Sequence, residues 1–141
     1  MPHVHVRNLQ RKFRVDALRL QKFAERALRL SFNLKQSSQI GDQPSELFVL
    51  LVSDQRMAAL HRRFLNATGP TDVITFQHGE IFISVPTTRR NAARFGNSPV
   101  REIKLCIVHG LLHLLGYGDQ DETNARKMRA AQTKVLKAAL G

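Results

Sequence analysis

The chain has 141 residues, 43% of them hydrophobic, which excludes an intrinsically disordered protein and is typical of a globular one. We therefore expect residues 1–141 to form a single domain around one core. Its 22 Lys and Arg residues against 11 Asp and Glu give a formal net charge of +11. Because such an excess is self-repelling unless a polyanion is near, the charge favours a nucleic-acid partner over a solubilising role or a membrane surface.

The first half of the chain predicts strands and helices in alternation. His3 to Val6 alternates apolar and polar residues, as a strand does, and Asp16 to Leu30 has apolar residues at helical spacing. Gln36 to Pro44 is polar and predicts a loop, whereas Glu46 to Val52 is an apolar run typical of a central strand. A helix should follow. Its N-cap is assigned to Ser53 or Asp54, and its apolar face carries Met57, Leu60 and Phe64.

In the second half, two β-rich runs precede three helices. Asp72 to Phe76 and Glu80 to Val85 are close enough in sequence to form a hairpin. A short helix capped by Thr87 or Thr88 is expected to run through Ala93. The last two helices are predicted over Pro99 to Leu115, ended by Gly116, and over about Asp121 to Leu140. This interleaving predicts an α/β (or α+β) fold with one mixed sheet of about four strands and about five helices.

The sequence also bears on where the protein works. No run approaches the roughly 20 apolar residues that a membrane span needs. The first residues, MPHVHVRNLQRKF, have no apolar stretch like that of a secretory signal, and the single cysteine, Cys106, excludes an intramolecular disulfide. These features predict a cytoplasmic protein.

The stretch HGLLHLLGYGDQD carries the strongest chemical signal in the chain. His109 and His113 are four residues apart in a predicted helix, so both rings project from one face and can bind one cation. Gly116 then ends the helix and reverses the chain, which brings Asp119 within reach of the same ion. Two imidazoles and one carboxylate leave a position open for water, as in catalytic rather than structural zinc sites. The sequence therefore predicts a metal site at the end of this helix.

Two histidines at helical spacing are more often surface or satisfied core residues, but here they lie in an apolar helix where uncompensated imidazoles are costly to bury. Gly110 follows the first histidine, where metalloproteases of the H-E-x-x-H type have their glutamate general base. A peptidase of the usual mechanism is therefore disfavoured. Gly110 also indicates close packing on this face of the helix, by a substrate or another backbone segment.

Three segments resemble those of a known family. HGLLHLLGYGD, PTDVITF (Pro70 to Phe76) and GEIFIS (Gly79 to Ser84) occur in that family's spacing. They resemble the H-G-x-x-H-L-x-G-Y-x-H, P-T-D-V-L-S-F and G-D-I-x-I-S segments of the YbeY-type endoribonucleases, the bacterial rRNA maturation factors. Glu102 and Met128 also match family positions, and the resemblance extends over roughly Glu46 to Leu136.

The resemblance implies a single-domain metal-dependent fold, one zinc ion, a cytoplasmic location and a role in ribosomal RNA processing and ribosome quality control. It implies that His109 and His113 are metal ligands. The family's third ligand is usually histidine, whereas this chain has Asp119, which adds negative charge and weakens the Lewis acidity of the metal. The family also has an arginine after an aromatic residue before the PTDV segment; here the pair is Phe64-Leu65, so that arginine is absent.

Several further residues are candidates for the site. Glu102, two helical turns before His109, is the first choice as general base, or else a structural partner. Asp72 is expected to accept hydrogen bonds from local backbone amides. Cys106 and His78 are alternative ligands, although a buried cysteine usually behaves as a small hydrophobe. Contacts to RNA phosphates are expected from residues that are otherwise ordinary surface charges, namely Arg62, Arg63, Arg89, Arg90 and Arg101.

Two functions from different classes follow. The first is a metal-dependent endoribonuclease that acts on single-stranded regions of ribosomal RNA. The second is an RNA- or ribosome-binding assembly factor with a structural metal and little cleavage activity. The eight Phe residues and one Tyr lie mostly in apolar patterns, so the sequence indicates no aromatic stacking platform and favours binding to phosphates and shape.

Overall fold

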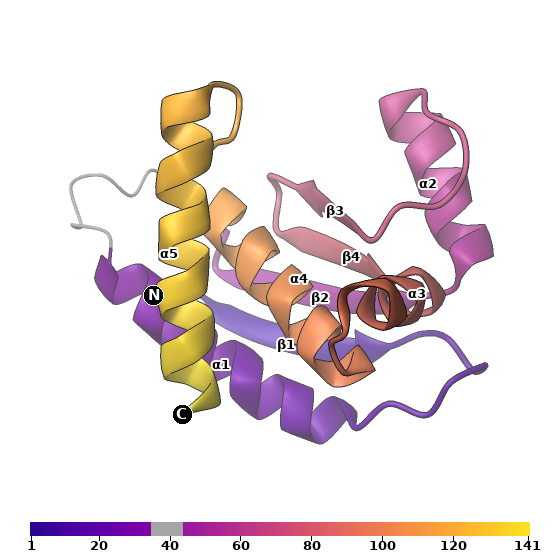
Figure 1. Ribbon diagram of the computed structural model, residues 1–141, viewed down its shortest axis with the longest axis horizontal. Helices are drawn as coiled ribbons and strands as arrows, with labels where there is room; N and C mark the ends of the chain where they lie inside the picture. Colours follow the sequence, from indigo (N-terminus) through magenta and orange to yellow (C-terminus); the bar gives the residue numbers. More distant parts are fainter. Residues whose placement is uncertain (35–43) are drawn as a thin grey trace.

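The computed structural model describes residues 1–34 and 44–141, which form one four-stranded sheet and five helices (Figure 1). The predicted loop from Gln36 to Pro44 lies, except for Pro44, outside the described residues. In chain order the elements are β1 (His3–Asn8), α1 (Ala17–Leu34), β2 (Glu46–Val52), α2 (Asp54–Leu65), β3 (Val73–Phe76), β4 (Glu80–Ser84), α3 (Val85–Phe95), α4 (Pro99–Leu114) and α5 (Glu122–Leu140).

The sheet is mixed, as predicted. Its strand order is β1-β2-β4-β3, with β1, β2 and β4 parallel and β3 antiparallel to β4. The predicted hairpin is confirmed, because β3 and β4 pair directly and the amide of Gly79 donates to the carbonyl of Phe76 across the turn. This topology makes β3 an edge strand with one side of its backbone unpaired within the sheet.

The two faces of the sheet are covered unequally. Helices α1, α4 and α5 pack together on one face and form the main core, whereas α2 lies against the other face over a smaller core (Figure 1). The central strands are apolar on both faces, which explains why β2 is an almost continuous apolar run. Within the described residues, no helix is long and apolar enough to cross a membrane.

The structure corrects two details of α2 and α3. Ser53 is the N-cap of α2, one of the two predicted caps, but Phe64 is 53% exposed and is not part of the buried face. Helix α3 begins at Val85, after Ser84 as N-cap, and not at Thr87 or Thr88. The Ser84 hydroxyl accepts from the Thr87 amide at 3.2 Å, and the proline in the first turn has no amide hydrogen to leave unpaired.

Helix α4 lies unusually close to the sheet at Gly110. A Cβ atom at this position would lie 2.7–2.9 Å from three side-chain atoms of Ile81, which is fully buried on β4. The close neighbour is therefore a side chain of the sheet, not a substrate or another backbone segment. Only glycine allows α4 to approach the central strand to this distance.

The first prediction concerns this contact. Gly110→Ala should destabilise the fold by about 1–2 kcal/mol, because overpacking against a stiff β-branched side chain outweighs the gain in helix propensity. Urea unfolding measures the change, and Gly118→Ala is the matched control, since a Cβ atom at Gly118 would have no neighbour within 4 Å. In an Ile81→Ala background the cost of Gly110→Ala should fall; equal costs in both backgrounds would contradict the contact.

The N-termini of α2 and α3 are joined through Asp54. The hydroxyls of Ser84 and Thr87 donate to its Oδ1 at 2.6 and 2.7 Å, and Arg90 Nη2 lies 2.8 Å from its Oδ2. Burial raises the pKa of Asp54, but the hydrogen bonds from Ser84, Thr87 and Arg90 outweigh it and hold the pKa below its usual value of 3.8. The carboxylate therefore stabilises the packing of α2 against α3 in its charged form.

The second prediction is a pH dependence. Because the pKa of Asp54 is lower in the folded state, its stabilisation is fully present above the unfolded value of 3.8 and is lost as pH falls through the folded value. Asp54→Asn should be about 1 kcal/mol less stable at neutral pH, and this difference should shrink in acid. Urea unfolding across the pH range measures it, with Asp16→Asn as an exposed control. A difference that stays constant well below pH 3.8 would rule out the charged form as the cause.

Candidate metal centre

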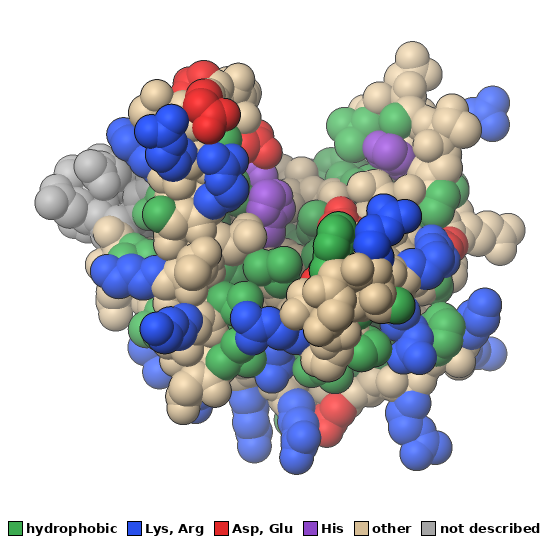
Figure 2. Space-filling view, viewed as in Figure 1, with side chains coloured by type: hydrophobic (Ala, Val, Ile, Leu, Met, Phe, Trp, Pro, Cys, Tyr) green, Lys and Arg blue, Asp and Glu red, His purple; other side chains and the backbone are tan. Residues whose placement is uncertain are grey.

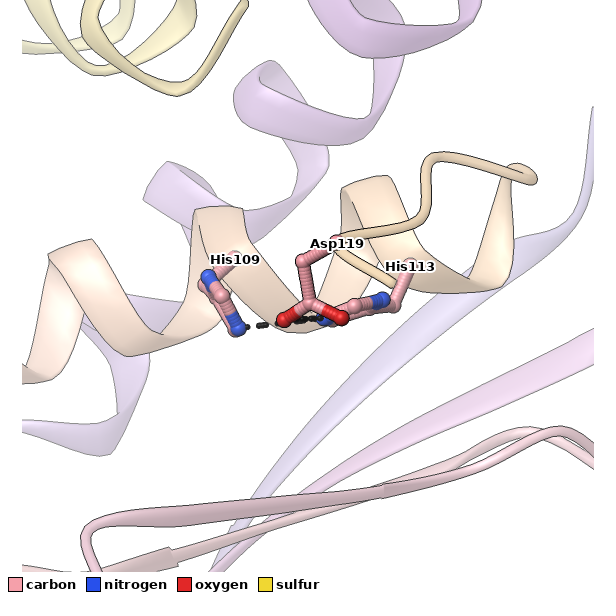
Figure 3. Close-up of side chains that lie close together, drawn as sticks. All are labelled: His109, His113 and Asp119. Atoms are coloured by element: carbon pink, nitrogen blue, oxygen red, sulfur yellow. Dashed lines mark hydrogen bonds and ion pairs between the residues drawn. The ribbon is translucent and has the colours of Figure 1, made fainter. Parts of the chain in front are cut away.

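His109 and His113 project from the same face of α4, one helical turn apart (Figure 3). Their Nε2 atoms are 3.1 Å apart, and the two rings meet nearly edge to face, with centroids 4.6 Å apart. Both residues are partly buried, whereas the positions between them, from Gly110 to Leu112, face the core. The same helix therefore packs its apolar face on the sheet and holds two imidazoles at its margin.

Asp119 returns to the two histidines after the chain reverses. Helix α4 ends at Leu114, and Gly116 has a φ of 103°, in the left-handed region that favours glycine. The amide of Tyr117 donates to the carbonyl of Leu112 at 3.0 Å, which closes the turn. Asp119 Oδ2 then lies 3.8 Å from His113 Nε2. One ligand atom from each of the three residues lies within 4.8 Å of the other two.

The outward ring nitrogens are held by neighbouring acceptors. His109 Nδ1 lies 2.9 Å from Gln132 Oε1 on α5, and His113 Nδ1 lies 3.1 Å from the carbonyl oxygen of Tyr117. Since both acceptors require a hydrogen on Nδ1, the lone pairs of the neutral rings are on the Nε2 atoms and face each other. Two lone pairs at this separation repel, and a cation between them removes the repulsion. The geometry therefore fits a metal ion.

The ionisation of His113 is compatible with this role. Burial and the neighbouring His109 lower the pKa of His113 from its usual value of 6.5, against the opposing effects of the Asp119 carboxylate and the Tyr117 carbonyl. The imidazole is therefore neutral at pH 7, the form that binds metals. The donor set, two imidazoles and a carboxylate from three protein residues, suits zinc with an open position and also other divalent ions.

Two hollows adjoin His109. One, of about 270 Å³, is lined by Asp72, Glu102, Cys106 and Gln132 as well as the histidine. The other, of about 250 Å³, runs along the free edge of β3; besides both histidines it is lined by Leu65, Val73, Ile74, Thr75, Phe76 and Gln77. Figure 2 shows the surface hollowed between the upper part of α5 and α2, with histidine side chains on its wall. A substrate in this hollow would contact the metal site from the side of β3.

The acidic and thiol candidates lie beside the metal cluster rather than in it. Glu102 is only 5% exposed, and its Oε1 accepts from Asn97 Nδ2 at 2.7 Å. Asp72 Oδ1 accepts from the amide of Val73 at 2.8 Å, which is the local role expected for it. Burial, followed by the nearby Asp72 and Glu102 charges, raises the pKa of the Cys106 thiol well above its usual value. The thiol is therefore protonated, which is not the ligand form.

The remaining sequence candidates are dispersed over the surface. His78 pairs with Glu80 at 2.6 Å, outside the metal cluster. Arg89 stacks over the ring of Phe13 and Arg90 pairs with Asp54. Among the described residues that line the two hollows at His109, none is an arginine; the five candidates Arg62, Arg63, Arg89, Arg90 and Arg101 lie on α2, α3 and the first turn of α4.

Gln132 is the functional candidate that sequence reasoning missed. The helical period does not distinguish a buried packing residue from one that reaches across to His109, because the crossing of α4 and α5 decides which side chains meet.

Comparisons with known proteins identify a family and a related fold. The family model described as Endoribonuclease YbeY matches residues 5–140. A protein named Endoribonuclease YbeY from Aquifex aeolicus is 34% identical over 151 residues, covering 97% of this chain and 93% of its own. Another so named, from Heliobacterium modesticaldum, is 33% identical over 116 residues, covering 67% and 70%. The solution structure of TM1509 from Thermotoga maritima superposes with a TM-score of 0.67 at 26% identity, covering 96% of this chain and 88% of that one.

The third prediction concerns Gln132. Gln132→Leu removes the acceptor that fixes the His109 ring and should weaken Zn²⁺ binding about 10–100-fold, as loss of such supporting hydrogen bonds generally does. Gln132→Glu keeps an acceptor and should retain most of the affinity. Competition with a chromogenic chelator measures the dissociation constants. Equal zinc affinity in Gln132→Leu and wild type would show that this hydrogen bond does not support the site.

Proposed function

The chain belongs to the YbeY endoribonuclease family, and we propose that it is a metal-dependent endoribonuclease acting on single-stranded regions of ribosomal RNA. The observation that carries the proposal is the pair of opposed Nε2 atoms, 3.1 Å apart, with the Asp119 carboxylate beside them. This arrangement offers three ligands and stands in a hollow open to solvent, as a catalytic metal site requires. The roles proposed are rRNA maturation and ribosome quality control.

We propose that His109, His113 and Asp119 hold one zinc ion. The chemistry supplied by such an ion is Lewis acidity, which favours the negative charge that develops on a phosphodiester during cleavage. Gln132 and the Tyr117 carbonyl hold the two imidazoles with Nε2 toward the ion. The Asp119 carboxylate contributes a negative charge that a histidine would not, so it lowers the net positive charge available to the substrate.

The proton-transfer and binding roles are also part of the proposal. Glu102 is the candidate proton acceptor, because its carboxyl group is buried and lines a hollow together with His109. Arg62 and Arg63 lie in the last turn of α2, three and two residues before Leu65, which lines the hollow at both histidines, so they are the nearest candidates in sequence for contacts to phosphates. Arg89, Arg90 and Arg101 are candidates for phosphate contacts with a longer RNA segment. Ribosomal factors are candidate protein partners.

A second function is favoured by two residues. Asp119 stands where the family pattern has a histidine, and Leu65 stands where it has an arginine. Both changes reduce positive charge at the site where the phosphate would react. A ribosome-binding assembly factor, with the metal in a structural role and little cleavage, is therefore the alternative.

The fourth prediction separates these functions. Purified wild type should contain one zinc per chain and cleave single-stranded rRNA fragments, and Asp119→Ala should lose at least about 100-fold in zinc affinity and lose cleavage, because two imidazoles alone do not complete the site. Asp119→His should keep the metal and cleave at least as fast as wild type. Asp121→Ser is the control, since it removes a nearby charge and keeps an N-cap for α5.

Each outcome has a clear reading. Zinc retained by Asp119→Ala at wild-type affinity would contradict the ligand assignment. One zinc per chain in wild type, without cleavage by wild type or Asp119→His, would replace the nuclease with the assembly factor.

A further inference from the structure

Three aromatic rings gather where α2 ends beside β3. The ring of Phe64 meets Phe76 edge to face, with centroids 5.3 Å apart, and the ring of His78 stacks on Phe76 at 5.6 Å with an interplanar angle of 21°. Phe76 also meets Phe82 edge to face at 5.7 Å, which anchors the group to the small core under α2. This differs from the sequence expectation that the chain has no aromatic platform. The rings come from three consecutive elements and the turn between β3 and β4, and the fold brings them into contact.

The outer part of this aromatic cluster (Phe64, Phe76 and His78) is open to solvent. Phe64 is 53% exposed and the adjacent Leu65 is 56% exposed. Both therefore lie outside the buried face of α2, which carries Met57. The guanidinium of Arg63 lies 5.3 Å from the centroid of the Phe64 ring. An exposed ring beside a cation is suited to an aromatic, negatively charged ligand, since the ring stacks on the ligand and the cation neutralises it.

The aromatic cluster adjoins the metal site through Phe76, and Phe64 packs on Phe76 from outside the lining of the hollow. The hollow of about 250 Å³ that both histidines line is also lined by Leu65 and Phe76. A ligand bound to the metal cluster through a phosphate therefore has an apolar and aromatic wall within the same hollow.

The free edge of β3 adds polar groups to this wall. The amide of Ser84 donates to the carbonyl of Asp72. From that position, hydrogen-bonded and non-hydrogen-bonded residue pairs alternate along β3 and β4. In an antiparallel pair every second residue directs its amide and carbonyl away from the partner strand, which places the carbonyl of Val73 and both groups of Thr75 on the free edge; the Val73 amide already donates to Asp72 Oδ1. These groups can form hydrogen bonds with the edge of a planar ligand in the hollow.

We propose that Phe64, together with Phe76 and Leu65, forms a binding site for an unpaired nucleobase of single-stranded RNA, next to the phosphate held at the metal cluster. This inference rests on the proposed function and deepens it by naming how the substrate is held. Stacking is tolerant of sequence, because every base has a π face, and it requires the base to be unpaired. The net charge of +11 favours RNA over a peptide strand added to β3 as the occupant.

The test measures binding without cleavage. Fluorescence anisotropy with the zinc-loaded protein and a labelled 2′-O-methyl uridine octamer, checked by gel to remain intact, gives the affinity for base-bearing RNA, and an abasic octamer with the same backbone gives the affinity for phosphates alone. Wild type should bind the base-bearing octamer at least about fivefold more tightly than the abasic one. Phe64→Leu should lose this preference while keeping its affinity for the abasic octamer, and Phe64→Tyr should restore it.

Phe95→Leu is the matched control, because Phe95 is a phenylalanine on α3 of similar exposure, 65%, that lies outside the aromatic cluster of Phe64, Phe76 and His78. It should behave as wild type. The slope of log affinity against log salt should be unchanged in Phe64→Leu, since no phosphate contact is removed.

The outcomes separate this inference from the proposed function. If wild type cleaves RNA but binds both octamers equally, the nucleobase site is overturned and the nuclease stands; binding by a protein segment at β3 would give this result. If Phe64→Leu keeps the preference, the assignment of the site to this cluster is overturned. If wild type binds neither octamer and cleaves no RNA, both proposals fall together.

Discussion

The close approach of α4 to β4 at Gly110 is the contact on which the rest of the site depends. Ile81, fully buried in the central strand, occupies the space that any side chain at Gly110 would need. His109 and His113 lie on either side of this glycine in α4. The contact of Gly110 with Ile81 therefore sets the distance of both histidines from the sheet. A larger residue would lift the helix, and both Nε2 atoms would move away from the edge of β3 and the hollow that they line. Core packing and ligand geometry are in this way the same constraint.

A second constraint is the short path from His113 to Asp119. The helix ends, Gly116 takes a φ of 103°, and the carbonyl of Tyr117 faces His113 Nδ1 at 3.1 Å. The reversal thus performs two tasks in a few residues, because it orients one imidazole and delivers the carboxylate. Gln132 performs the matching task for His109 from α5. Each histidine is held by a different element, so the geometry of the pair depends on how α4, α5 and the connecting turn pack together.

Much of this arrangement was predictable because it is local. The helical period places His109 and His113 on one face, and the glycine after the helix indicates the reversal that returns Asp119. The Ser-Pro start of α4 and the apolar run of β2 depend on similarly short-range rules. Strand order, and the partner of Gly110, could not be predicted, because both depend on which elements meet across the sheet. The start of α3 was misplaced for a different reason: Ser84 serves both as the last residue of β4 and as the cap of the next helix.

The same distinction explains why the aromatic cluster is absent from the sequence pattern. Phe64 fits the apolar period of α2 and was assigned to its buried face, but it lies in the last turn of the helix with its ring partly in water. The hollow at the metal site therefore has two unlike walls. One carries His109 and His113, with the Asp119 carboxylate beside them, and the other carries Leu65 and Phe76, the wall proposed to hold a base. The Asp119 carboxylate alone would repel an RNA phosphate, whereas a cation bound by the histidines and Asp119 would cancel that repulsion and would let a phosphate occupy the first wall while its base lies on the second.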